Sequence, residues 1–166
     1  KRFTSLAHFW LGASLMLAPI SAWIALRGEA VMAAPSDLLP PTLLGVAVLL
    51  WVAGFDIIYA CQDYTYDVAS KLRSIPARLG ITRALRLASL CHAGMIGALV
   101  ALPPLCPALG LSWIYGSGIA AVAALLTYEH WLVRPDDLTR VNIAFFQVNA
   151  IVSIGLFLVG TLDLLT

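Results

Sequence analysis

The sequence predicts an all-α membrane protein, in which five transmembrane helices form a single domain over residues 1–166. The composition is the first reason, because 61% of the residues are hydrophobic and only 11% are charged. Soluble domains carry roughly 25% charged residues. The mean hydropathy of +0.91 is the second reason. The third is that five stretches reach the roughly 20 apolar residues that a bilayer-spanning helix needs. We therefore expect the chain to lie in a lipid bilayer.

The five predicted spans follow one another with short connections, so neighbouring spans should run antiparallel. They cover Ser5–Leu26, Leu39–Gln62, Ile81–Leu102, Leu111–Val133 and Val141–Leu164. Each is longer than the apolar core of a signal peptide, and no cleavage signature accompanies them. Lys1 is not a natural start residue, so we expect the chain to be a fragment of a longer protein or a trimmed one.

The basic residues predict how these spans are oriented. They precede the first span, lie between or just past the second and third, or lie between the fourth and fifth: Lys1, Arg2, Lys71, Arg73, Arg78, Arg83, Arg86, Arg134 and Arg140. Only Arg27 lies on the other side. Because connections rich in Lys and Arg stay in the cytoplasm, we expect a multi-pass protein of the inner (plasma) membrane. Its N-terminus and the connection after the second span should face the cytoplasm.

Two polar connections interrupt the apolar spans at that end. In the longer one, Asp63–Gly80, Pro76 is expected to discourage continuous helix, and Gly80 suits a turn or a helix C-cap. A short helix around Val68–Leu72 is possible there. The shorter connection, Arg134–Arg140, is expected to be a turn.

Three aspartates stand out because the chain has few charges. Asp56, Asp63 and Asp67 are seven and four residues apart, which places their carboxylates on one side of a helix. Tyr59 lies near the same face, one turn after Asp56. The stripe begins inside an apolar span, and acids at membrane depth are costly and usually functional. We interpret this stripe as the functional site.

Two carboxylates one helical turn apart, Asp63 and Asp67, can hold Mg²⁺, which prefers oxygen ligands and is often completed by substrate phosphates. Arg73 and Arg78, together with Lys71, could neutralise phosphate oxygens. This pattern favours a diphosphate ester as the substrate, with its isoprenoid tail in the apolar bundle. The alternative is a solvated connection whose acids and bases merely balance.

Other polar residues in the spans favour structural roles. His8 and His92 are expected to be packed between helices rather than to act as ligands. Asn142 and Asn149 lie seven residues apart on one face, where interhelical hydrogen bonding is favoured and substrate contact comes second. Asp163, close to the C-terminus, is expected to be solvated.

The acidic stripe also resembles a known motif. Asp56-x-x-Tyr59-Ala60-x-x-Asp63-x-x-x-Asp67, followed by Ser74-Ile-Pro-Ala-Arg78-Leu-Gly80, resembles the second aspartate-rich motif of the UbiA superfamily of intramembrane aromatic prenyltransferases. The similarity is greatest to 4-hydroxybenzoate polyprenyltransferases and a sister group. Lys1–Thr4 resembles the segment before the fifth helix of that branch, and Val141–Asn149 resembles its last helix, so the resemblance runs from end to end.

The resemblance implies a bundle of nine transmembrane helices around a central cavity, of which this chain would supply helices five to nine. It also implies that Mg²⁺ bridges a polyprenyl diphosphate to Asp63 and Asp67. Asp56, Tyr59 and Arg2 would form the catalytic group, with Asp56 and Arg2 contacting the aromatic acceptor. Lys71, Arg73, Arg78 and Asn149 are the further substrate-binding candidates.

The chain departs from the family pattern in two places. The first aspartate motif, of Asn-Asp-x-x-Asp type, belongs to the first half of these proteins, and no Asn-Asp pair occurs in this sequence. The chain alone would therefore hold half of the metal site and be inactive. Lys71 also stands where the family usually has Gly.

The function expected from this pattern is Mg²⁺-dependent transfer of a polyprenyl group from polyprenyl diphosphate to a hydroxylated aromatic carboxylate, 4-hydroxybenzoate or similar, in quinone biosynthesis. A dihydroxynaphthoate acceptor of the menaquinone pathway is a serious alternative, because Arg2 would fit either carboxylate. A cation-coupled transporter would spread its acids over several spans, whereas here they gather at one end. A structural membrane subunit is a third class, and nucleic acid is not an expected partner.

Overall fold

The computed structural model describes residues 1–166 and is helical throughout, without β-strands, which confirms the predicted fold class. In chain order the elements are α1 (Ala7–Ala33), η1 (Pro35–Leu38), α2 (Leu39–Ala60), η2 (Cys61–Asp63), α3 (Tyr64–Ala69), α4 (Ile75–Leu79), α5 (Ile81–Leu105), η3 (Pro107–Leu109), α6 (Trp113–Leu132), η4 (Ile143–Val148) and α7 (Asn149–Leu165). The segment η4 is a π-helix that runs directly into α7.

Each predicted span corresponds to one of the long helices. Four helical stretches are long and apolar enough to cross a membrane: Ala7–Ala33, Pro35–Ala69, Ile81–Leu105 and Ile143–Leu165. The remaining long helix, α6, has 20 residues. Its mean hydropathy is lower than that of the four stretches above, because its last turns carry Tyr128, Glu129 and His130.

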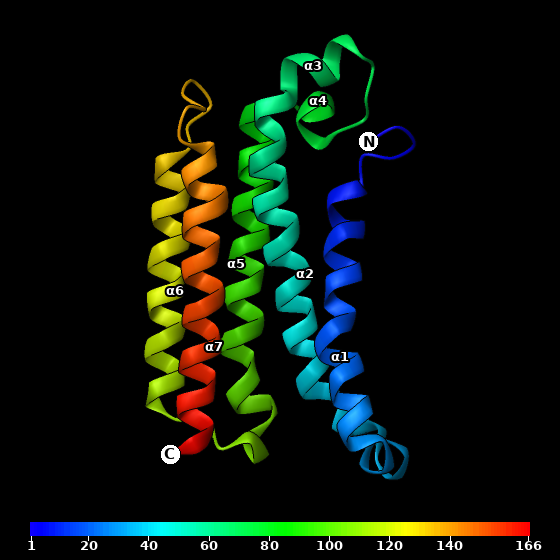
Figure 1. Ribbon diagram of the computed structural model, residues 1–166, viewed down its shortest axis with the longest axis vertical. Helices are drawn as coiled ribbons and strands as arrows, with labels where there is room; N and C mark the ends of the chain where they lie inside the picture. Colours follow the sequence, from blue (N-terminus) through cyan, green and yellow to red (C-terminus); the bar gives the residue numbers. More distant parts are fainter.

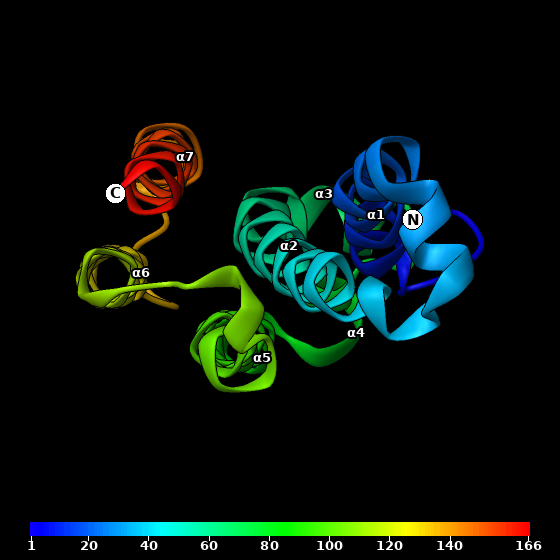
Figure 2. The same ribbon diagram turned by 90° about the horizontal axis from the view of Figure 1, so that it is seen from below.

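The long helices stand side by side and alternate in direction (Figure 1). Seen from below, α1, α2, α5 and α6 follow one another in an arc, and α7 lies next to α6 (Figure 2). The closest pairings are α1 with α2 and α2 with α5. The N-terminus, α3, α4 and the 133–140 connection lie at one end of the bundle (Figure 1). The three basic regions therefore share one end, as the sequence predicts.

Glycine allows α1 to approach α2 closely. A Cβ atom added to Gly12 would lie 2.5 Å from the backbone oxygen of Leu49, so a larger residue would push the two helices apart. Small residues permit such approaches between membrane helices. This contact brings the first turns of α1 against the last turns of α2, where the aspartates begin.

The aspartate connection is more structured than the sequence indicates. The α2 helix ends at Ala60 and passes through the 3₁₀ turn η2 into α3, so the short helix expected around Val68–Leu72 begins earlier, at Tyr64. As expected, no continuous helix runs through this connection, since α3 ends at Ala69 and α4 begins at Ile75. Pro76 lies in the first turn of α4, where proline needs no backbone hydrogen bond. The Ser74 hydroxyl caps that helix by accepting a hydrogen bond from the Ala77 amide at 3.3 Å.

Gly80 ends α4 and precedes α5, as the sequence predicts for a turn glycine. Its φ of 78° and ψ of 158° lie in a region that is essentially limited to glycine. The conformation redirects the chain from the short α4 into the long α5. It thereby packs α4 against the end of the bundle that carries the aspartates.

Candidate functional site

Asp63 and Asp67 converge on one positive charge. The Oδ2 atom of Asp63 lies 2.8 Å from the Lys1 ammonium nitrogen, and the Oδ2 atom of Asp67 lies 3.3 Å from it. Asp63 belongs to the η2 turn and Asp67 to α3, so the bend between α2 and α3 brings the two carboxylates to the same cation. This is the geometry that a shared metal ion requires of the pair.

Asp67 is the buried member of this pair. Its side chain is 1% exposed, against 49% for Asp63, and its Oδ2 atom accepts no hydrogen bond. Buried carboxylate oxygens normally have a hydrogen-bond partner or a cation beside them. The two acids therefore fit a divalent cation by their donor type and by their shared approach to the point that Lys1 occupies.

The Lys1 side chain responds to the two acids. Burial alone would lower the pKa of its ammonium group, but the close contacts and negative charges of Asp63 and Asp67 outweigh that effect and raise the pKa above its usual value. A raised lysine pKa means that the ion pairs are fully formed at neutral pH. On the lysine side, they are lost as the pH rises through the raised pKa.

Asp56 faces the same side of the bundle but has a different partner. Its Oδ2 atom lies 2.6 Å from Nδ1 of His8 in α1. His8 is buried, whereas the Asp56 side chain is 26% exposed. All three aspartates thus point toward α1 and the segment before it, but only Asp63 and Asp67 share a cation.

Tyr59 departs from the predicted stripe. Its ring packs against Phe145 of η4, with the ring centroids 4.3 Å apart, and against Phe146 at 6.5 Å. Phe145 in turn contacts Phe55. The ring of Tyr59 therefore belongs to an aromatic cluster between α2 and η4 and does not lie with the carboxylates.

Two of the expected phosphate-binding residues attach to the segment that carries Lys1. Nη1 of Arg73 donates to the Phe3 carbonyl at 3.3 Å, and the Arg73 amide donates to the Lys1 carbonyl at 2.7 Å. Nη1 of Arg78 donates to the Ser5 hydroxyl at 3.0 Å. Both side chains are exposed and retain free guanidinium donors.

Lys71 and Arg2 are exposed and make no side-chain hydrogen bond or ion pair, so the structure does not join them to the aspartates. Lys71 nevertheless has a distinctive backbone. Its φ of 54° makes it the only non-glycine residue in the left-handed region, which glycine adopts without steric cost. The position where the resemblance leads one to expect Gly therefore has the conformation that favours Gly.

Asn149 takes part in an interhelical hydrogen bond, the role that the sequence favours. Its Oδ1 atom accepts from the Trp51 indole at 2.7 Å, and its Nδ2 donates to the Phe145 carbonyl at 2.9 Å. Asn142 instead accepts from Gln62 at 3.2 Å, near the aspartate connection. The two asparagines thus connect the last helix to α2 and η2, respectively.

A second buried polar cluster links α5 to α6. Nδ1 of His92 lies 3.0 Å from Nε2 of His130 and 3.4 Å from Oε2 of Glu129. Across residues 1–166, no three His, Cys, Asp or Glu side chains are grouped so that they could hold a metal ion. We interpret this cluster as a structural contact between α5 and α6. At Asp63 and Asp67, a metal ion would need further ligands from a substrate or from another segment.

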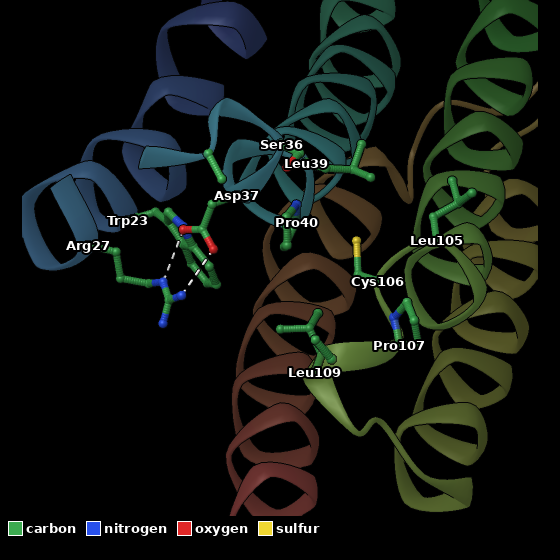
Figure 3. A pocket seen from close by; sticks show the side chains of 12 residues that line it. Trp23, Arg27, Ser36, Asp37, Leu39, Pro40, Leu105, Cys106, Pro107 and Leu109 are labelled. Atoms are coloured by element: carbon green, nitrogen blue, oxygen red, sulfur yellow. Dashed lines mark hydrogen bonds and ion pairs between the residues drawn. The ribbon is translucent and has the colours of Figure 1, made fainter. Parts of the chain in front are cut away.

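The opposite end of the bundle holds a polar pocket of about 350 Å³. Its acid, Asp37, accepts hydrogen bonds from Nε and Nη2 of Arg27, both at 3.0 Å, and from the Trp23 indole at 2.8 Å (Figure 3). Asp163 is also at this end and is buried, contrary to expectation. It caps α6 by accepting hydrogen bonds from the hydroxyl and amide of Ser112 and from the Tyr115 amide.

Apolar cavities lie between the helices, away from the aspartate end. One of about 260 Å³ is lined by side chains of α1, α2, α5, α6 and α7, and one of about 210 Å³ adjoins it and reaches Trp51. They share the lining residues Pro19, Leu44, Leu99 and Leu156. The aromatic contact between Trp51 and Phe55 continues from there toward Tyr59 and the aspartates.

The contact between His8 and Asp56 is the feature that sequence reasoning missed. The signal was nonetheless available, because both residues lie near the same predicted end of neighbouring antiparallel spans. A histidine and an aspartate, each rare in apolar helices, at the same depth are expected to pair.

Comparison with known proteins was made against family models, curated sequences and solved structures. The model of the UbiA prenyltransferase family matches residues 1–151. A mitochondrial 4-hydroxybenzoate polyprenyltransferase from Aedes aegypti is 31% identical over 165 residues, which is 98% of this chain and 35% of that protein. A 4-hydroxybenzoate octaprenyltransferase from Alkalilimnicola ehrlichii is 27% identical over 169 residues, 95% of this chain and 51% of its own length.

A mitochondrial 4-hydroxybenzoate polyprenyltransferase from Arabidopsis thaliana is 32% identical over 139 residues, covering 84% of this chain and 31% of that protein. No solved structure matches the chain. The chain spans between about a third and a half of the length of these relatives.

Proposed function

The chain belongs to the UbiA prenyltransferase family, and from this premise we propose that the protein containing it transfers a polyprenyl group from polyprenyl diphosphate to a hydroxylated aromatic carboxylate. We propose 4-hydroxybenzoate as the acceptor, because the relatives are described as acting on it. The product would be a precursor in quinone biosynthesis.

The observation that carries this proposal is the convergence of Asp63 and Asp67 on one cation, with a buried carboxylate oxygen that accepts no hydrogen bond. Such a pair suits Mg²⁺, which uses one or two carboxylates and completes its shell with substrate phosphates and water. When bound there, Mg²⁺ would stabilise the charge on the diphosphate leaving group.

The residues around this pair have separate roles in the proposal. Arg73 and Arg78 hold the diphosphate oxygens through their free guanidinium donors. The polyprenyl tail follows the aromatic cluster into the apolar cavities, which exclude the water that would otherwise quench the allylic cation. Arg2, which is exposed and unpaired, holds the carboxylate of the acceptor.

The bond changes follow from these placements. The allylic C–O bond breaks and its electron pair leaves with the diphosphate, while a ring carbon of the acceptor forms the new C–C bond. Asp56 accepts a hydrogen bond from the phenol and draws its proton away as the ring attacks. The phenol proton returns when the ring carbon loses its own proton, which leaves with the diphosphate.

We also propose that the aspartate end faces the cytoplasm and that the protein lies in the inner (plasma) membrane. The support is that nine of the ten basic residues belong to the three regions at that end of the bundle. The opposite end has one basic residue, Arg27, in the last turns of α1. This asymmetry is the one that the positive-inside rule relates to orientation.

Replacing Asp63 with alanine in the whole protein tests the proposal. We expect Mg²⁺-dependent prenyl transfer to disappear, because one of the two carboxylates is lost while the exposed side chain contributes little to packing. Asp136→Ala is the matched control, since it removes an exposed acid at the same end that has no partner. It should keep wild-type activity and Mg²⁺ dependence.

The assay should offer both 4-hydroxybenzoate and a dihydroxynaphthoate to the purified wild-type protein at several Mg²⁺ concentrations. Transfer to the first acceptor supports the proposal, and transfer only to the second would replace the proposed acceptor. Full Mg²⁺-dependent activity in the Asp63→Ala protein would reject the assignment of the metal pair.

A further inference from the structure

His8 and Asp56 form a close pair between two helices. Nδ1 of His8 and Oδ2 of Asp56 are 2.6 Å apart. The pair joins α1 to α2 at the aspartate end, where Gly12 allows the two helices to approach closely. Neither residue contacts the acid pair of Asp63 and Asp67, so this contact is separate from the metal-binding geometry.

The two side chains differ in exposure, which indicates that Asp56 can contact a ligand and His8 cannot. His8 is 2% exposed and is fixed by packing, whereas Asp56 is 26% exposed and keeps one oxygen available to a ligand. The other ring nitrogen of His8, Nε2, is buried and has no hydrogen-bond partner. Because Nδ1 is the only ring nitrogen with an acceptor, we assign the N–H to Nδ1, which donates to Asp56.

We propose that His8 is a positioning residue for the prenyl transfer and that it holds the Asp56 carboxylate in the orientation that accepts the phenol hydrogen of the acceptor. This inference rests on the proposed function. The Nδ1–H donor engages Oδ2, which leaves Oδ1 free for the phenol. His8 itself touches neither substrate.

The alternative is that His8 only fills space between α1 and α2. Burying a polar atom without a partner is costly, and Nε2 is unpartnered in both His8 and His92, so the partner of Nδ1 distinguishes the two histidines. An apolar side chain of similar size would avoid that cost. The one hydrogen bond that His8 does make is to the aspartate that the family resemblance places at the acceptor.

Three substitutions at His8 separate positioning from packing in the whole protein. His8→Asn keeps an N–H donor near the position of Nδ1, whereas His8→Gln places its donor near Nε2, and His8→Leu has none. We expect His8→Leu and His8→Gln to lower kcat for prenyl transfer roughly 100-fold, the lower range for loss of a positioned acid or base. His8→Asn should recover most of the wild-type kcat.

The KM for polyprenyl diphosphate should be unchanged in all three variants, because Asp63, Asp67 and the arginines are intact. His92→Leu is the control, since it removes another buried histidine that does not contact Asp56. It should lower thermal stability but keep the wild-type kcat per folded molecule. A ¹⁵N NMR spectrum of labelled histidine should show the proton of His8 on Nδ1.

Three results would overturn the inference alone. They are wild-type kcat in His8→Leu, equal losses in all three His8 variants, and a bare Nδ1 in the ¹⁵N spectrum. A wild-type protein that transfers prenyl groups to neither acceptor would instead reject the proposed function, and the positioning role with it. The two failures are therefore distinguishable from the wild-type assay.

Discussion

The two ends of the bundle treat their acids differently. At the end opposite the aspartate connection, Asp37 accepts three hydrogen bonds from Arg27 and Trp23, and Asp163 accepts three from residues at the start of α6. At the aspartate end, Asp63 and Asp67 share a single lysine, and a buried oxygen of Asp67 accepts no hydrogen bond.

Among these four aspartates, the difference separates structural acids from acids that are available to a ligand. A carboxylate whose oxygens already have donors stabilises the fold and has little left to offer a cation. A buried carboxylate with an unsatisfied oxygen is costly unless something else binds it. The composition of the two ends is similar in kind, since each combines acids with arginine, so hydrogen-bond satisfaction is the more informative property.

Exchanging the acids at the two ends for amides is the strongest test of this comparison. In the whole protein, Asp67→Asn should lower prenyl transfer at least about 100-fold, because a neutral amide stabilises neither the cation nor the charge it supports. Thermal stability should change little. Asp37→Asn should do the opposite, lowering the thermal midpoint while leaving the activity per folded molecule intact.

Both variants can be measured by prenyl transfer and by thermal unfolding in the same detergent. The comparison breaks if Asp37→Asn lowers activity per folded molecule as much as Asp67→Asn does. It also breaks if Asp67→Asn mainly unfolds the protein, since the acid pair would then serve the fold. If the Asp67→Asn protein keeps residual activity, a higher Mg²⁺ requirement would support the assignment of Asp67 to cation binding.

The sequence predicted the helices and the acid pair because these follow from local rules. Apolar stretches of bilayer length must satisfy their own backbone as helices, and a four-residue spacing brings Asp63 and Asp67 near each other even where the helix bends. It did not predict that Asp56 and Tyr59 separate from that pair. Their partners, His8 and Phe145, are distant in sequence, and only packing chooses them.

The position of Asp163 has the same cause. Proximity to the C-terminus predicts a solvated side chain, yet the packing of α7 beside α6 places Asp163 at the start of α6. Pro76 shows what local rules can predict, because the helix is interrupted before it as expected. Tertiary structure, which a local pattern does not contain, determined the role of Asp163.

The contact between Asn149 and Trp51 gives a prediction of intermediate size. Asn149→Ala leaves the Trp51 indole N–H without an acceptor, which should cost about 1–3 kcal/mol of unfolding free energy. In a double-mutant cycle with Trp51→Phe, the two changes should couple by roughly 1 kcal/mol, within the range for membrane helices. Denaturant titration in mixed micelles measures both quantities.

The same variant addresses the second reading of Asn149, as a substrate contact. If the residue only connects α7 to α2, the KM for both substrates stays at the wild-type value in Asn149→Ala. An increase in KM for one substrate, without energetic coupling to Trp51, would show that Asn149 contacts that substrate. Asn142→Ala, which removes only the exposed contact with Gln62, is the control.

The smallest expected effect concerns Lys71, which carries the strain of a left-handed backbone at the aspartate end. Lys71→Gly should relieve the roughly 1–2 kcal/mol that this conformation costs a residue with a Cβ atom, offset by about 0.5–1 kcal/mol of extra chain entropy in the unfolded state. The net gain should raise the thermal midpoint by about 2 °C. Lys71→Ala removes the same charge but keeps the strain, so it should show no such gain. If Lys71 binds the diphosphate, both variants lose affinity for it equally. The difference between their thermal midpoints still measures the strain alone. If both variants keep full activity, Lys71 is dispensable for prenyl transfer, and its backbone strain is unrelated to function. Equal thermal midpoints for the glycine and alanine proteins would instead show that the backbone at this position carries no strain.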